Sequence, residues 1–280
     1  MNTADKMFEL TVVIPNHNKA NYLKQCIDSV FAQTLGVKEV IVFDDCSTDD
    51  SLSVLHKCKE NYTKLKVIPS MVNVGVSAAR DIAIRQSVTP YVTFIDADDF
   101  YWDKNKLMKE MQIVQKHYVE TGALCCAYSQ TVLVNKEGNR IDSQKIRNWD
   151  RYRRIGTVTR LYKYWIPRDY CFPKDAYIEV GGFEKGLSLY EDWDLNLRLY
   201  QRCKFCFSGV YGTAYRQETG GLSSINCKKH YEKKKYVFSK NKHTIQYSFG
   251  EQLIFYILLN ASHIKNEMMN LLHRGDKHET

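Results

Sequence analysis

The sequence lacks the segments that mark secreted and membrane-spanning proteins. Its first ten residues, MNTADKMFEL, contain no basic stretch followed by the apolar run that a signal peptide requires. Its most apolar late segment, residues 253–259, is far shorter than the roughly 20 residues that cross a bilayer. We therefore expect a cytoplasmic protein. If it associates with a membrane, we expect peripheral contact at the cytoplasmic face.

Several nucleotide- and metal-binding signatures are also missing. The nine cysteines include one CxxC pair, Cys203 and Cys206, but no second pair completes a zinc site. No GxxxxGK[ST] segment is present, which argues against a P-loop hydrolase, and no GxGxxG follows the first expected strand, which argues against a dinucleotide-binding fold. With 44% hydrophobic and 26% charged residues over 280 positions, the composition is that of an ordinary globular protein.

What is present is an alternation of short apolar runs and amphipathic segments over the first hundred residues. The expected strands are 10–14, 39–43, 66–69 and 91–95, and the expected helices between them are 19–32, 50–61 and 76–87. This order predicts an α/β fold with a mostly parallel central sheet flanked by helices. Beyond residue 100 the pattern loosens into helices at 105–118 and 192–202, one or two strands over 123–134, and at 251–272 either one amphipathic helix or two that break near Ala261.

Polar, turn-forming residues follow each of the four expected strands. The clusters are Pro15-Asn16-His17-Asn18, Asp44-Asp45, Asn73-Val74-Gly75 and Asp96-Ala97-Asp98-Asp99. In open α/β sheets, ligands bind outside the carboxyl ends of the strands, so these clusters predict a binding site at one edge. Any single cluster also fits a turn or a helix cap, but capping does not require doubled acids.

The three acids after the fourth strand indicate a cation. Carboxylates as close as Asp96, Asp98 and Asp99 raise one another's pKa unless a cation lies between them. Mg²⁺ and Mn²⁺ are hard ions that take oxygen ligands and often share them with substrate phosphates. Asp45 would accept a hydrogen bond from a base N–H, and Arg80 would face the base or a phosphate.

In this order and spacing the motifs resemble those of the inverting family 2 glycosyltransferases, which have a GT-A fold. The segments that carry the resemblance are VVIPNHN (12–18), YLKQCIDSVFAQT (22–34), EVIVFDDCSTDDS (39–51), NVGVSAARD (73–81), YVTFIDADD (91–99) and VGGFEKGLSLYEDWDLNLRL (180–199). The chain departs from the family at Asn16 and His17, where a small hydroxylated residue and an aromatic one are usual. It also has one extra residue in the loop 102–105.

The resemblance implies a role for each matching residue. Asp96-Ala97-Asp98 is similar to the DxD motif, in which Asp96 would lie near the ribose and Asp98 would ligate a divalent metal, Mn²⁺ or Mg²⁺, on the donor diphosphate. Glu191-Asp192 is similar to the ED motif, with Asp192 as the general base. The other implied nucleotide-sugar contacts are Pro15, Asn16, His17, Asn18, Asp45 (for uracil), Asn73, Gly75 and Arg80.

The implied protein is a metal-dependent inverting glycosyltransferase that moves a sugar from a nucleotide sugar, expected to be a UDP-sugar, to a hydroxyl acceptor. A glycan or lipid-linked glycan of bacterial surface polysaccharide or lipopolysaccharide synthesis is the expected acceptor. The expected domains are a GT-A domain over 8–220, with a nucleotide-binding half (8–100) and an acceptor-binding half (101–220), and a basic helical C-terminal extension over 221–280.

The net charge of +8 is concentrated at 145–168 and 228–243, where anionic partners such as phosphates or acidic lipids would bind. The basic run at 228–243 would either hold a loop over the diphosphate or, together with 251–272, contact anionic lipid. Within this run, His230 is a further candidate metal ligand. A nucleic-acid partner is not expected, because acids occupy the strand ends. A catalytically inactive GT-A-like scaffold remains an alternative, as does a sugar-phosphate nucleotidyltransferase, although the latter needs a Gly-rich basic loop at 16–18.

Overall fold

The computed structural model describes residues 6–143, 169–217, 227–242, 249–250, 252–261 and 264. Its main sheet has the strand order β3-β2-β1-β4-β8. The strands are β1 (Leu10–Asn16), β2 (Glu39–Asp44), β3 (Leu65–Pro69), β4 (Tyr91–Phe94) and β8 (Phe172–Pro173). The first four are mutually parallel, and β8 runs antiparallel to β4. The predicted α/β class with a mostly parallel sheet is confirmed.

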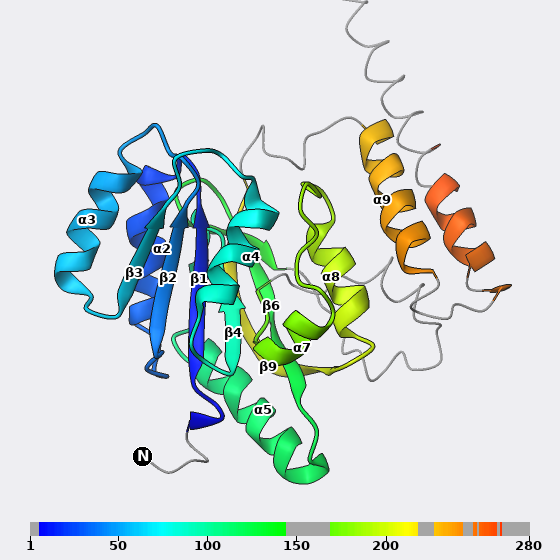
Figure 1. Ribbon diagram of the computed structural model, residues 1–280, viewed down its shortest axis with the longest axis horizontal. Coiled ribbons are helices and arrows are strands. Elements are labelled where there is room, and N and C mark those ends of the chain that lie inside the picture. Colours follow the sequence, from blue (N-terminus) through cyan, green and yellow to red (C-terminus); the bar gives the residue numbers. More distant parts are fainter. Residues whose placement is uncertain are drawn as a thin grey trace, which may run out of the picture.

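Helices cover both faces of this sheet, and for that reason every residue of β1 and β2 is buried. Alternate strand residues point to opposite faces, so Val12 and Ile14 pack with α2 (Ala20–Phe31) and α3 (Ser51–Asn61). On the other face Val13 packs with α4 (Val76–Gln86). Figure 1 shows α2 and α3 on one side of the sheet and α4 on the other. The four parallel strands therefore deliver their loops to one edge.

A second, four-stranded sheet follows, in the order β5-β9-β6-β7. It consists of β5 (Phe100–Tyr101), β6 (Cys125–Val134), β7 (Arg140–Ser143) and β9 (Lys204–Arg216), and α5 (Lys106–Thr121) precedes β6. The pairing of β6 with β9 is parallel and shifts register twice, between Tyr128 and Thr131. This sheet brings the end of β9 against the loop that follows β4.

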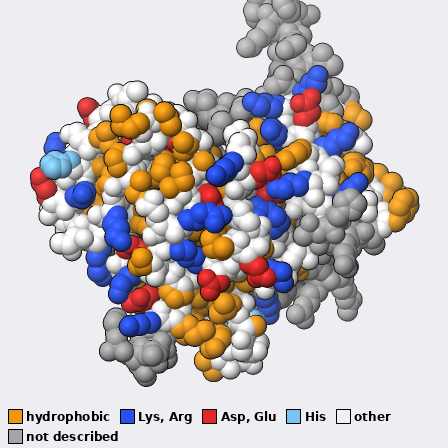
Figure 2. Space-filling view, viewed as in Figure 1, with side chains coloured by type: hydrophobic (Ala, Val, Ile, Leu, Met, Phe, Trp, Pro, Cys, Tyr) orange, Lys and Arg blue, Asp and Glu red, His pale blue; other side chains and the backbone are white. Residues whose placement is uncertain are grey.

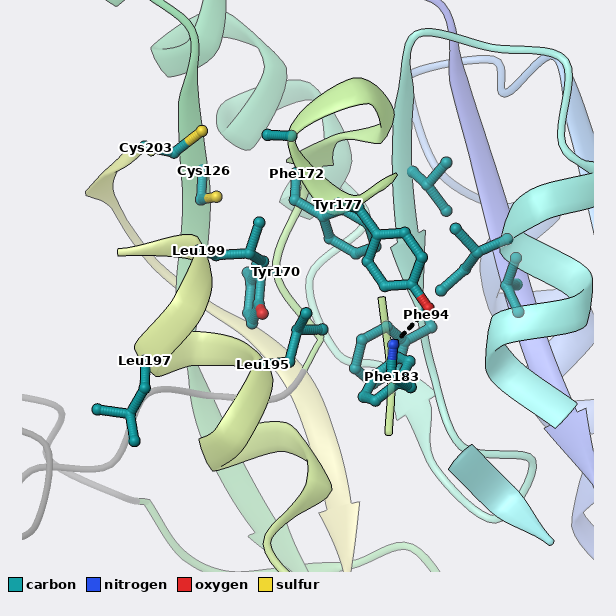
Figure 3. Packing of buried hydrophobic residues seen from close by; sticks show 14 of the residues in the cluster. Phe94, Cys126, Tyr170, Phe172, Tyr177, Phe183, Leu195, Leu197, Leu199 and Cys203 are labelled. Carbon is teal, nitrogen blue, oxygen red and sulfur yellow. Dashed lines mark hydrogen bonds between the residues drawn. The ribbon is translucent and has the colours of Figure 1, made fainter. Parts of the chain in front are cut away.

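The helices of the C-terminal half pack onto the α4 side of the main sheet. They are α7 (Lys174–Glu179), α8 (Glu191–Leu199), α9 (Cys227–Asn241) and a helix over 252–261. In the core, Leu195 and Leu199 of α8 lie beside the ring of Tyr170, and the Tyr177 hydroxyl accepts a 2.9 Å hydrogen bond from the Phe183 N–H (Figure 3). None of the described helices is both long and apolar enough to cross a membrane.

The described elements that the sequence prediction lacks are β5, β7, β8, β9 and α7. The side chains of β9 alternate poorly between buried and exposed, and β8 is two residues that become a strand only by pairing with β4. The predicted helix at 251–272 is described over 252–261, and its remainder lies largely outside the described residues, as does the basic cluster at 145–168. The expected domain boundary at 220 also falls outside them and stays a prediction.

Candidate active site

The loops after β1 and β2 are joined through Asn16, the buried last residue of β1. Its Nδ2 donates to Asp44 Oδ1 over 2.6 Å, and its carbonyl accepts the Asp45 N–H over 2.7 Å. Pro15 is buried one step earlier and lies in register with Phe43. Because β1 and β2 are parallel neighbours, the backbone places both loops side by side.

Asp45 organises the third loop. Its two carboxylate oxygens accept the backbone N–H groups of Val74 (2.6 Å) and Gly75 (2.8 Å). Gly75 has a positive φ of 83°, which a side chain would strain, and it precedes the first residue of α4. Uracil recognition by Asp45 stays a prediction, and the carboxylate that would perform it is already held rigidly in place.

His17 and Asn73 lie exposed at this edge of the sheet. The His17 Nδ1 donates to the Asp45 carbonyl over 2.8 Å, and Asn73 Nδ2 lies 3.3 Å from both ring nitrogens. Asn18, at a positive φ of 55°, accepts the Thr48 N–H on its Oδ1 over 2.7 Å. Asn18 therefore fixes one loop to the next, while the His17 ring is exposed.

The acids after β4 come together, but each has a different neighbour. One oxygen from each of Asp96, Asp98 and Asp99 lies within 4.8 Å of the others. Asp98 pairs with Lys19 at 2.7 Å and its side chain is 26% exposed. Asp99 is buried and accepts the N–H of Arg216, the last residue of β9, over 2.8 Å. Asp99 thus holds the two sheets together, and Asp98 is the most accessible of the three.

Arg80 connects the DxD loop to the ED motif. The side chain is 1% exposed, and its guanidinium donates to Glu191 Oε1 over 2.8 Å and to Asp96 Oδ1. It also lies over the Phe94 ring, 4.7 Å from the centroid. Burial, followed by the charge of Asp192, raises the pKa of Glu191, and Arg80 opposes that rise. The structure therefore places Arg80 between two carboxylates, whereas the sequence suggested a base or phosphate contact.

Asp192 stands on the first turn of α8, immediately after the anchored Glu191. It is half-buried, and its Oδ1 accepts the Trp193 N–H over 2.7 Å. Tyr190, the residue before Glu191, has a positive φ of 63°. Its hydroxyl forms a 2.9 Å hydrogen bond with His230 Nδ1 of α9. The ion pair of Arg80 and the bond from α9 therefore hold this turn from two sides.

Three residues of the site were not found by sequence reasoning. Lys19, Tyr190 and Arg216 contact the acids or their neighbours, and the resemblance assigns none of them a role. Lys19 and Tyr190 have a local signal, because Lys19 directly follows the loop after β1 and Tyr190 directly precedes Glu191. Ala97 is buried between the two acids of the DxD motif and makes no polar side-chain contact, as its residue type requires.

Comparison with known proteins identifies the family. The model of glycosyl transferase family 2 matches residues 11–174. The chain belongs to glycosyl transferase family 2. The match covers the clusters after β1 to β4 but ends before Glu191, so the ED assignment depends on the motif and its geometry.

Curated relatives include a chondroitin synthase of Pasteurella multocida, which is 26% identical over 70% of this chain and 19% of its own length. The putative teichuronic acid biosynthesis glycosyltransferase TuaG of Bacillus subtilis is 30% identical over 48% of this chain and 50% of its own. The chain thus spans between a fifth and a half of these relatives. Residues 1–349 of S. aureus TarS in complex with UDP-GlcNAc superimpose with a TM-score of 0.65 at 20% identity, over 84% of this chain and 66% of TarS. This likeness confirms the GT-A fold.

Proposed function

We propose that this family 2 protein is a metal-dependent inverting glycosyltransferase that transfers a sugar from a UDP-sugar to a hydroxyl of a glycan or lipid-linked glycan acceptor. The observation that carries the proposal is the buried guanidinium of Arg80, which contacts both Asp96 and Glu191. It joins a donor-side acid to the turn that bears a candidate base.

The donor would bind over the ends of β1, β2 and β4. The exposed His17 ring offers a stacking surface for the base, and Asp45 offers carboxylate oxygens at the same edge. TarS binds UDP and UDP-GlcNAc on the same fold, which supports a uridine nucleotide as the donor here. Relatives named as polysaccharide synthases support a glycan acceptor of the bacterial surface.

The acids of the DxD loop fit a divalent metal. Three carboxylate oxygens lie within 4.8 Å of one another, and Asp98 is the most exposed, so we assign the ligand role to Asp98. When bound, Mn²⁺ or Mg²⁺ would supply charge neutralisation for the diphosphate. Asp96 is held by the buried Arg80 and Asp99 by the Arg216 N–H, whereas Asp98 pairs with the more exposed Lys19, a partner that it would exchange for a metal ion.

Asp192 would take the proton of the acceptor hydroxyl. The acceptor oxygen attacks the anomeric carbon as the bond from that carbon to the phosphate oxygen breaks, and the proton passes to the Asp192 carboxylate. One displacement with one base inverts the anomeric centre. No second carboxylate is assigned to the sugar, as a covalent glycosyl-enzyme would require. The Arg80–Glu191 pair keeps this turn in place while the acceptor binds.

The test measures UDP release from UDP-sugars, with water in place of the acceptor, and thermal stabilisation by UDP with and without Mn²⁺. We expect Asp192→Asn to keep UDP stabilisation while turnover falls about 100-fold or more. Asp98→Asn should lose the Mn²⁺-dependent part of UDP stabilisation. Glu60→Gln, which changes an exposed acid on α3, serves as the matched control.

Wild-type turnover in Asp192→Asn would refute the assignment of Asp192 as the general base. Absence of UDP stabilisation under either condition would refute the donor, and UDP binding without turnover would favour the scaffold.

A further inference from the structure

The last described helix, residues 252–261, is apolar on two opposite faces. Its sequence, QLIFYILLNA, contains no charged residue. One face is covered, because Phe255 stacks on Phe238 of α9 with ring centroids 3.8 Å apart and an interplanar angle of 10°. The Tyr231 hydroxyl of α9 donates to Asn260 Oδ1 over 2.8 Å. These contacts fix the helix beside α9 and determine which of its faces is turned outward.

The outward face exposes large aliphatic side chains. Leu253, Ile254 and Ile257 are 51%, 44% and 57% exposed, and the spacing i, i+1, i+4 places them on one side of the helix. Phe249 before the helix and Ile264 after it are also exposed. Figure 2 shows hydrophobic side chains gathered at the right-hand edge of the molecule, where Figure 1 places this helix. An apolar surface of this kind usually marks an interaction site.

A stripe of lysines runs beside this face. α9 carries six lysines and one glutamate. Lys228 and Lys235 of α9 and Lys242, which directly follows α9, recur every seven residues and are exposed, and these three form the lysine stripe. Tyr231 and Phe238, which contact helix 252–261, share this seven-residue interval. Because residues three or four apart are neighbours on a helix, the stripe borders the contact with helix 252–261.

We propose that helix 252–261 and the lysine stripe of α9 dock on an anionic lipid bilayer, with Leu253, Ile254 and Ile257 entering the headgroup region. Exposed aliphatic residues flanked by lysines match the two requirements for binding in the interface, which are apolar area and attraction to acidic headgroups. A second copy of this chain fits less well, since a twofold contact would bring one lysine stripe against the other. The basic run that the sequence indicated is thus half of the surface, and the helix supplies the other half.

The same α9 also reaches the proposed catalytic turn. His230, five residues before Lys235, hydrogen-bonds Tyr190, the residue that precedes Glu191. Docking would therefore hold the turn of Asp192 close to the bilayer surface, where a lipid-linked acceptor presents its hydroxyl. This last step rests on the proposed function, whereas the docking itself does not.

The experiment is vesicle flotation of the full chain, with vesicles of phosphatidylcholine alone or mixed with phosphatidylglycerol, at low and high salt. The wild type should float with the mixed vesicles and not with the neutral ones, and salt should weaken the binding. Lys235→Gln with Lys242→Gln should lower the partition coefficient roughly fivefold for each lysine. Ile254→Gln with Ile257→Gln should lower it by about tenfold or more.

The matched control is Val88→Gln with Val119→Gln, which replaces exposed aliphatic residues elsewhere on the molecule and should float like the wild type. A wild type that does not float with acidic vesicles at low salt would overturn the proposal. So would a dimer that dissociates in the Ile254→Gln, Ile257→Gln variant, because the face would then bind a second copy. UDP stabilisation, measured on the same samples without vesicles, tests the transferase proposal separately.

Discussion

Arg80→Lys is the substitution that tests the centre of this site most directly. The arginine is 1% exposed and its forked guanidinium donates to two carboxylates, Asp96 and Glu191, whose side chains are 17% and 10% exposed. A lysine keeps the charge, but its single ammonium cannot reach both acids in the same geometry. The variant therefore separates the effect of the two-carboxylate bridge from the effect of the positive charge alone.

The magnitude follows from the contacts that are lost. A hydrogen bond between charged groups contributes about 1.5–3 kcal/mol, and loss of the stacking over Phe94 adds about 0.5–1 kcal/mol. We expect Arg80→Lys to lower the free energy of unfolding by about 2–3 kcal/mol, and Arg80→Ala by about 3 kcal/mol or more, because two buried carboxylates would then face each other. Turnover should fall further than stability alone explains, since the turn of Asp192 loses its anchor.

The assay is equilibrium unfolding in urea, combined with a double-mutant cycle between Arg80→Lys and Glu191→Gln. We expect a coupling free energy of about 1–2 kcal/mol. The matched control is Arg85→Lys on the same helix, whose side chain is 44% exposed and pairs with Asp81, and it should change stability by less than about 1 kcal/mol. A coupling below about 0.5 kcal/mol, or equal effects at positions 80 and 85, would refute the bridge as the link between the two motifs.

Two further predictions concern single ion pairs. Lys19→Gln removes the cation that pairs with Asp98 at 2.7 Å, so the Mn²⁺ concentration for half-maximal UDP stabilisation should fall severalfold; a rise would show that Lys19 assists the donor. Burial acts to raise the pKa of Glu39, but hydrogen bonds from Lys66 and the Val88 N–H outweigh it and leave that pKa lowered from 4.5. A lowered pKa stabilises the fold above the unfolded value, so Glu39→Gln should reduce stability by about 1 kcal/mol at pH 7, and the difference should vanish as the pH falls below about 4.5 in urea titrations. A difference that persists at low pH would contradict the ionic origin.

The sequence by itself was sufficient for the parallel sheet and for the edge that carries the site. Strands buried on both faces are continuous apolar runs, and amphipathic helices repeat every 3.6 residues, so both have local signals. The loops after consecutive parallel strands must reach the same edge, so the sequence predicts that Asn16, Asp45 and Asp98 lie close together. The DxD and ED motifs were visible because each is a short run of neighbouring residues.

Only the tertiary structure decided how these motifs are joined. Residues 80 and 191 are brought together by the packing of α4 against α8, and residues 99 and 216 by the return of β9, and neither pairing has a periodic signal. For the same reason the sequence could mark residues 253–259 as apolar but not say which of them face outward. Phe255 is buried because it meets Phe238 of α9, whereas Ile257 of the same helix is 57% exposed. Hydrophobicity is a property of each residue, but burial depends on what the rest of the chain places against it.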